Sequence, residues 1–117
     1  MGTSFIEYKQ SGFWSHDSYI ESWITTLLEE MKKAATLLAW QEQMIDHWRV
    51  QVTIDAGCMS LELNKFLTDS SREQFVLEVA QQALVFSQPV GRKTGELFIK
   101  LLEGQLHTDA SSPIDYL

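Results

Sequence analysis

The sequence predicts a single all-α domain of four to five helices, with an extended N-terminal arm at residues 1–16 and an irregular tail at 105–117. Two observations support this class. Apolar residues recur at helical spacing in several stretches, and residues typical of helix ends separate these stretches. The 117 residues, 44% of them hydrophobic, are enough for one core, and no linker is long enough to divide domains. An α+β fold with a short strand near 49–54 is the alternative.

The N-terminal arm is rich in aromatic residues and lacks a helical period. Two interpretations stay open. The arm is either a strap laid over the helices that covers the core, or an exposed aromatic patch that binds a partner, since Trp and Tyr are favoured at interfaces. The residues concerned are Phe5, Ile6, Tyr8, Phe13 and Trp14.

The first predicted helix begins at Ser18, which together with Glu21 has the spacing of a capping box. Behind this box, apolar residues recur at intervals of three and four and form one stripe that should face the core. The stripe consists of Ile20, Trp23, Ile24, Leu27, Leu28 and Met31.

A second helix is predicted from Trp40 to Ala56, with Gly57 as the left-handed residue that ends it. Its second half alternates polar and β-branched residues, which is why a strand near 49–54 competes with the helix. A short capped turn is expected over 60–67. The residues of this helix expected inside the core are Trp40, Met44, Ile45, Trp48 and Val52.

A third long helix should open with a capping box made by Ser70 and Glu73. Residues 87–95 contain a proline, two glycines and a basic pair, which predicts an exposed loop. A last short helix, closed by Gly104, should follow this loop. The apolar residues of these two helices are Phe75, Val76, Val79, Ala80, Ala83, Leu84, Leu97, Phe98, Leu101 and Leu102.

The charge balance limits the classes of partner. Sixteen Asp and Glu stand against nine Lys and Arg, for a formal net charge of −7. Such a field repels phosphate backbones, so nucleic acid is an improbable ligand. It favours a basic protein partner, although the charge is explained equally well by solubility alone.

Residues able to perform chemistry are sparse. Cys58 is the only cysteine, so neither an intramolecular disulfide nor a cysteine-rich zinc site can form. The pairs His16-Asp17 and Asp46-His47 have no further ligand one helical turn away. We therefore expect no metal, no cofactor and no catalytic residue, hence no enzyme. Exposed carboxylates such as Glu42 and Asp46 are interpreted as a solvated face.

The N-terminus does not have the basic and apolar regions of a signal peptide, and no apolar run approaches the roughly 18 residues that span a bilayer. The sequence therefore predicts a cytoplasmic protein without a membrane partner.

The run from Gly12 to Asp17, followed by the apolar stripe, and then the run from Phe66 to Asp69 with Arg72 opening the next helix, resemble a known family. The family is that of the small acidic helical immunity proteins that bacteria encode beside polymorphic or contact-dependent toxins. The resemblance implies tight binding of one cognate toxin in the cytoplasm, often with carboxylates covering a basic active site, and no catalysis.

The leading hypothesis is therefore a protein-binding module that neutralises a basic toxin domain. One alternative is a structural or adaptor subunit that acts through homo-oligomerisation. Another is a small-molecule binder or an enzyme whose pocket lies between helices and leaves no motif. The residues expected to contact a partner are Glu29, Glu42, Asp46, Phe13 and Trp14.

Overall fold

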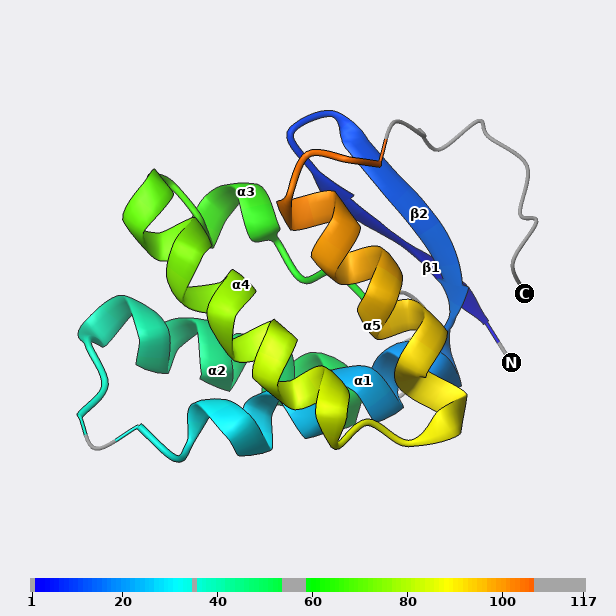
Figure 1. Cartoon of the computed structure of the whole chain (residues 1–117), viewed down its shortest axis with the longest axis horizontal. Coiled ribbons are helices and arrows are strands. Elements are labelled where there is room, and N and C mark those ends of the chain that lie inside the picture. The colour runs from blue at the N-terminus through cyan, green and yellow to red at the C-terminus, as the bar shows by residue number, and fades with distance from the viewer. Residues whose placement is uncertain (1, 35, 54–58, 107–117) are drawn as a thin grey trace.

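The computed structural model describes residues 2–34, 36–53 and 59–106, which form an N-terminal β-hairpin followed by five helices (Figure 1). The all-α expectation is thus partly right, and the α+β class fits as well. The strands, however, lie in the predicted arm, while 49–53 are helical and residue 54 lies outside the described residues. The elements are β1 (Thr3–Tyr8), β2 (Ser11–His16), α1 (Asp17–Met31), α2 (Ala39–Thr53), α3 (Leu63–Phe66), α4 (Ser70–Val85) and α5 (Pro89–Leu102).

The hairpin covers the helices with one face of its two antiparallel strands. Ile6 pairs with Phe13 across the strands, and both side chains are buried, as is Tyr8. The interpretation of the arm as a strap over the core is therefore confirmed. Lys9 and Gln10 connect the strands with positive φ angles of 50° and 70°, the geometry of the tight turns whose twist suits a hairpin.

The outer face of the hairpin carries an aromatic pair. The rings of Phe5 and Trp14 lie 5.3 Å apart and are half-buried. Gly12 lies beneath the Phe5 ring, because a Cβ atom there would meet the carbonyl oxygen of Ile6 and come within 2.6 Å of that ring. Only glycine fits this position, and the Phe5 ring covers the backbone that glycine leaves bare.

Helix α1 follows β2 without a linker. Its N-cap is His16, which makes no side-chain cap, so the predicted Ser18–Glu21 capping box is wrong. The strand pairing sets the start of the helix instead: the Asp17 amide donates to the Gly2 carbonyl at 2.9 Å, and the Asp17 carboxylate accepts from the Ser4 hydroxyl at 2.6 Å. All six residues of the predicted apolar stripe are buried.

Helix α2 confirms the predicted helix over its described part. Met44, Ile45 and Trp48 are buried, and the Trp48 indole donates to the Leu61 carbonyl at 2.8 Å. Trp40 and Val52 pack at the edge of the core. The predicted end of this helix at Gly57 lies outside the described residues.

Helix α4 is capped one residue earlier than the sequence predicts. Its N-cap is Asp69, whose carboxylate accepts from the Arg72 amide at 2.9 Å, so the Ser70–Glu73 capping box is wrong. Asp69 adopts the extended backbone that an N-cap requires and places its oxygen over the first turn. Glu73 is thereby left to contact the hairpin.

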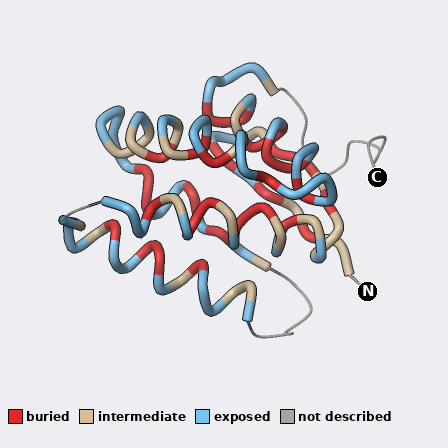
Figure 2. Tube along the Cα trace, turned by 60° about the horizontal axis from the view of Figure 1, so that its bottom comes forward, coloured by how far each residue is buried: buried red, intermediate tan, exposed pale blue. Residues whose placement is uncertain are grey.

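The predicted loop at 87–95 is also wrong, because helix α5 already begins at Pro89, which takes the first helical position. Gly91 and Gly95 bring α5 close to α1: a Cβ on Gly95 would lie 2.6 Å from the Trp23 ring. The predicted helix end at Gly104 is confirmed by its φ of +74° and by the hydrogen bond of 2.9 Å from the Gln105 amide to the Lys100 carbonyl. Figure 2 shows the buried residues on the sides of the helices that face one another.

Candidate binding site at the hairpin turn

The turn of the hairpin lies beside α3 and the C-terminal end of α5 (Figure 1). The segment that opens α4 reaches the same place, because Tyr8 on β1 contacts Glu73 on α4. Four parts of the chain that are distant in sequence therefore meet at this end of the molecule.

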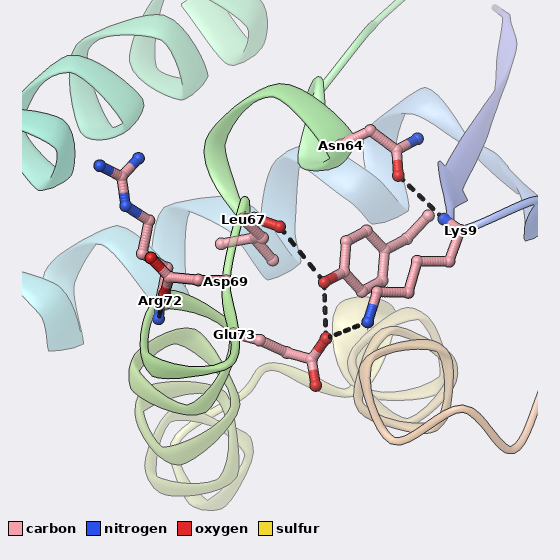
Figure 3. Close-up of polar contacts among 7 residues, drawn as sticks. Lys9, Asn64, Leu67, Asp69, Arg72 and Glu73 are labelled. Carbon is pink, nitrogen blue, oxygen red and sulfur yellow. Dashed lines mark hydrogen bonds and ion pairs between the residues drawn. The ribbon is translucent and has the colours of Figure 1, made fainter.

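A buried tyrosine anchors the turn (Figure 3). The Tyr8 hydroxyl donates to Oε2 of Glu73 at 2.6 Å and lies 3.5 Å from the Leu67 carbonyl oxygen. The Lys9 ammonium contacts the same Oε2 at 3.0 Å, and the Lys9 backbone amide donates to the Asn64 side chain at 2.9 Å. The end of β1 and the first residue of the turn are thus bound to α3 and α4.

These contacts fix the protonation states of the cluster. The hydrogen bond from Tyr8 lowers the pKa of Glu73, and Lys9 lowers it further, against the opposing effect of burial. Burial and the carboxylate of Glu73 raise the pKa of Tyr8. At neutral pH the site therefore presents a fixed carboxylate and a neutral hydroxyl, which can hold a cation.

A hollow of about 340 Å³ opens beside this cluster. Its described walls combine an apolar side from α5 and the residues after it with the carboxylates of Glu73 and Glu103. A second hollow of similar volume lies between β1 and the segment 60–65. The described residues around the first hollow are Tyr8, Lys9, Ser11, Glu73, Leu101, Leu102, Glu103, Gly104 and Leu106.

The predicted acidic contact residues lie elsewhere. Glu29 is on α1, and Glu42 and Asp46 are one turn apart on α2, a helix well separated from the hairpin turn in Figure 1. All three are exposed, and Asp46 forms an ion pair of 3.2 Å with Arg49. These carboxylates are therefore accessible to a partner.

The two predicted aromatic contact residues differ in exposure. Phe13 is 2% exposed and belongs to the core, so its side chain does not face solvent. Trp14 is half-buried on the outer face, where it packs on Phe5. Of the two, Trp14 alone has surface to offer.

Local sequence patterns do not reveal the Tyr8–Glu73 cluster, because 65 positions separate its two members. Glu73 has a spacing to Ser70 that suggests a helix cap, which hides its long-range role. The available signal is the position of Lys9 at the tip of an aromatic arm, which becomes meaningful only once the hairpin is known.

The described residues contain no group of three or more His, Cys, Asp or Glu that could hold a metal ion. Cys58 lies outside them. His47, in one of the two pairs noted in the sequence, contacts the Ser60 carbonyl at 2.8 Å and the Glu62 carboxylate at 3.4 Å. Within 2–34, 36–53 and 59–106, no helix is long and apolar enough to cross a bilayer.

No protein-family model matches the chain, and no curated protein or solved structure shows significant similarity to it.

Proposed function

We propose that this protein is a non-catalytic binding module that acts in the cytoplasm as an immunity-type inhibitor and neutralises a basic toxin domain by covering it. The observation that carries the proposal is the charge on the solvent side of α1 and α2. Helix α1 contains four acidic residues and no Lys or Arg between Asp17 and Met31.

The exposed positions of α1 form a continuous stripe. Ser18, Glu21, Thr25 and Glu29 are exposed at intervals of three and four residues. On α2, Glu42 and Asp46 are exposed, with Arg49 as the sole cation of the helix. The two helices therefore display four exposed carboxylates, of which Asp46 is the one that pairs with a cation of its own helix.

These carboxylates contribute little to folding, since exposed charges and surface ion pairs stabilise proteins weakly. Complementary charge instead accelerates the encounter of two proteins and selects the sign of the partner. A basic domain is the partner that such a surface favours.

The proposal is tested with two variants of equal charge. One carries Glu29→Lys, Glu42→Lys and Asp46→Lys, and the other carries Glu7→Lys, Glu78→Lys and Glu96→Lys, which are exposed residues on other elements. Each variant and the parent chain serve as bait in extracts of the native host, the captured chain is identified, and its association rate is measured at low and high salt.

We expect a basic partner that binds the parent and the second variant, and whose association with the first variant is at least tenfold slower. Salt should slow association with the parent. Production of the partner alone should be toxic to cells, and co-production of this protein should restore growth. An acidic partner, or equal binding by both variants, contradicts the proposal.

One observation favours the adaptor alternative. Val85, Phe86 and Val90 are 71%, 62% and 48% exposed where α4 turns into α5. Exposed apolar side chains that gather in one place are typical of association surfaces. Oligomerisation through this turn is the second candidate function.

A further inference from the structure

The hollow beside the hairpin turn is lined by Glu73, whose two carboxylate oxygens differ in their contacts. Oε2 of Glu73 accepts from both Tyr8 and Lys9, whereas Oε1 accepts no hydrogen bond from the described residues (Figure 3). A carboxylate offers about four lone-pair positions on its two oxygens, and it can accept the planar fork of an arginine with both.

The Lys9 ammonium remains open to solvent although it contacts Glu73 and lies 5.3 Å from the centre of the Tyr8 ring. Its side chain is 69% exposed, whereas that of Glu73 is 24% exposed. An ion pair with one partner in water contributes little, and the long lysine side chain loses rotamer freedom by staying in place. Another cation can therefore replace Lys9 at small cost.

The remaining wall of the hollow suits the stem of such a cation. Leu101 and Leu102 are buried and Leu106 is half-buried, and all three line the space together with the exposed Glu103. Lys9 is the sole Lys or Arg among the described lining residues, which carry two carboxylates. Arginine and lysine bury their aliphatic stems against apolar surface and keep the charged end on acidic groups.

We propose that this hollow is the docking site for an arginine or lysine side chain of the partner, which displaces the Lys9 ammonium from Glu73. In the free protein, the Lys9 ammonium then occupies the position that the incoming cation takes in the complex. The assignment of this side chain to a partner protein rests on the proposed function. The preference of the hollow for a cationic group on an aliphatic stem follows from its lining residues and does not depend on that function.

The test uses N-acetyl-arginine amide as the probe and follows the backbone amide signals of the isotope-labelled chain by NMR. N-acetyl-citrulline amide is the matched control, because it has the same shape without the charge. We expect saturable shifts that are confined to residues 8–11, 73 and 101–106 with the arginine compound. Equal shifts with the citrulline compound, or shifts spread over all acidic surfaces, overturn the proposal.

The displacement of Lys9 by the arginine compound is tested with two pairs of variants. The two members of each pair change the net charge by the same amount. Lys9→Gln should tighten binding of the arginine compound at least threefold relative to Lys100→Gln, because it removes the competitor. Glu73→Gln should weaken binding at least fivefold relative to Glu96→Gln. Identical affinities within either pair overturn the proposal.

Because Glu73→Gln also removes a contact of the hairpin, Glu103→Gln is the second variant. Glu103 makes no described ion pair, and its loss should weaken binding about twofold without altering the dispersion of the spectrum. Unchanged affinity in Glu103→Gln together with a collapsed spectrum in Glu73→Gln counts against the site.

The outcomes separate this inference from the proposed function. If the arginine compound binds as described while both triple charge variants capture the partner equally, the docking hollow stands and the acidic face of α1 and α2 is discarded. If the charge variants differ but the compound does not bind, the hollow is discarded.

Discussion

Gln10 occupies a left-handed backbone conformation with φ of 70° and is exposed at the tip of the hairpin. For residues with a Cβ this conformation costs roughly 1–2 kcal/mol, and glycine adopts it freely. Lys9 next to it is in the same region. The hairpin therefore keeps two residues where a more stable turn would have asparagine and glycine.

We predict that Gln10→Gly raises the free energy of unfolding by about 0.5–1 kcal/mol, because the strain removed exceeds the extra entropy that glycine gains in the unfolded chain. Urea unfolding followed by tryptophan fluorescence measures the change. The control is Gln43→Gly on the exposed side of α2, which should lose about 1 kcal/mol. A loss of stability at Gln10 would show that its side chain, and not its backbone, matters.

Gly95 illustrates the opposite case. Alanine forms helix better than glycine by about 1 kcal/mol, yet the added Cβ would lie 2.6 Å from the Trp23 ring. We predict a net loss of about 1–3 kcal/mol for Gly95→Ala, since α5 must move away from α1. Thermal unfolding compared with Glu96→Ala, an exposed neighbour, provides the measurement; equal melting temperatures would refute the close packing.

At the scale of elements, the hairpin is tied to α4 by the contacts of Tyr8 and Lys9 with Glu73, and this tie depends on the charge of Glu73. Its pKa in the folded state is lowered below the usual value of 4.5. A group with a lowered pKa stabilises the fold above its unfolded pKa, and this contribution is lost as the pH falls through the folded pKa. The tie is therefore intact at neutral pH and weakens in acid.

We predict that Glu73→Gln lowers the free energy of unfolding by about 1.5–3 kcal/mol at pH 7, the usual contribution of hydrogen bonds to a charged group. The difference from the parent should shrink steadily as the pH falls below 4.5. Urea unfolding across pH 3–7 measures it, and Tyr8→Phe combined with Glu73→Gln shows how much of the loss belongs to their shared bond. A difference that is independent of pH would contradict the charged tie.

The alkaline side offers a second readout of the same tie. The pKa of Tyr8 is raised in the folded state, so the folded chain holds the phenol proton at pH values where the unfolded chain has lost it. The parent should therefore lose stability as the pH rises above the usual tyrosine value of about 10, and Tyr8→Phe should lose less over that range.

The helices could be predicted because their information is local. The apolar residues from Ile20 to Met31 recur about one helical turn apart within one segment, and all six are buried. The hairpin lacks such a pattern, because buried serines interrupt its inner face. Ser4 and Ser15 are each 1% exposed and bond to Asp17 and Thr94.

Tertiary contacts explain why the sequence misplaced the start of α5 and the role of Glu73. Gly91 and Gly95 suggest a loop when read locally, but they permit the approach of α5 to Ser22 and Trp23 on another helix. Glu73 likewise has its partner on β1. The candidate site depends on long-range pairs, Tyr8 with Glu73 and Lys9 with Asn64, so no local pattern in the sequence predicts its place.

For the whole molecule, the exposed turn between α4 and α5 bears on the state of association. The Lys33 ammonium lies 4.9 Å from the centre of the Phe86 ring, so a charge interrupts the apolar surface. We predict a monomer of 13.4 kDa by light scattering. Val85→Ser with Phe86→Ser should change neither the mass nor, beyond about 0.5 kcal/mol, the stability. A dimer that the double variant dissociates would favour the adaptor function.

His16 ends β2 and Asp17 begins α1, so no free residue lies between them. The direction of the hairpin relative to α1 is therefore set by contacts along its length, from the Ser15 hydroxyl with Thr94 near the junction to the Tyr8 hydroxyl with Glu73 near the turn. A six-residue strand spans about 20 Å, so a tilt of roughly 10° at the junction would move the turn by about 3–4 Å. A displacement of that size would break the 2.6 Å hydrogen bond from Tyr8 to Glu73. This bond therefore restricts the angle between the hairpin and α1 to a narrow range.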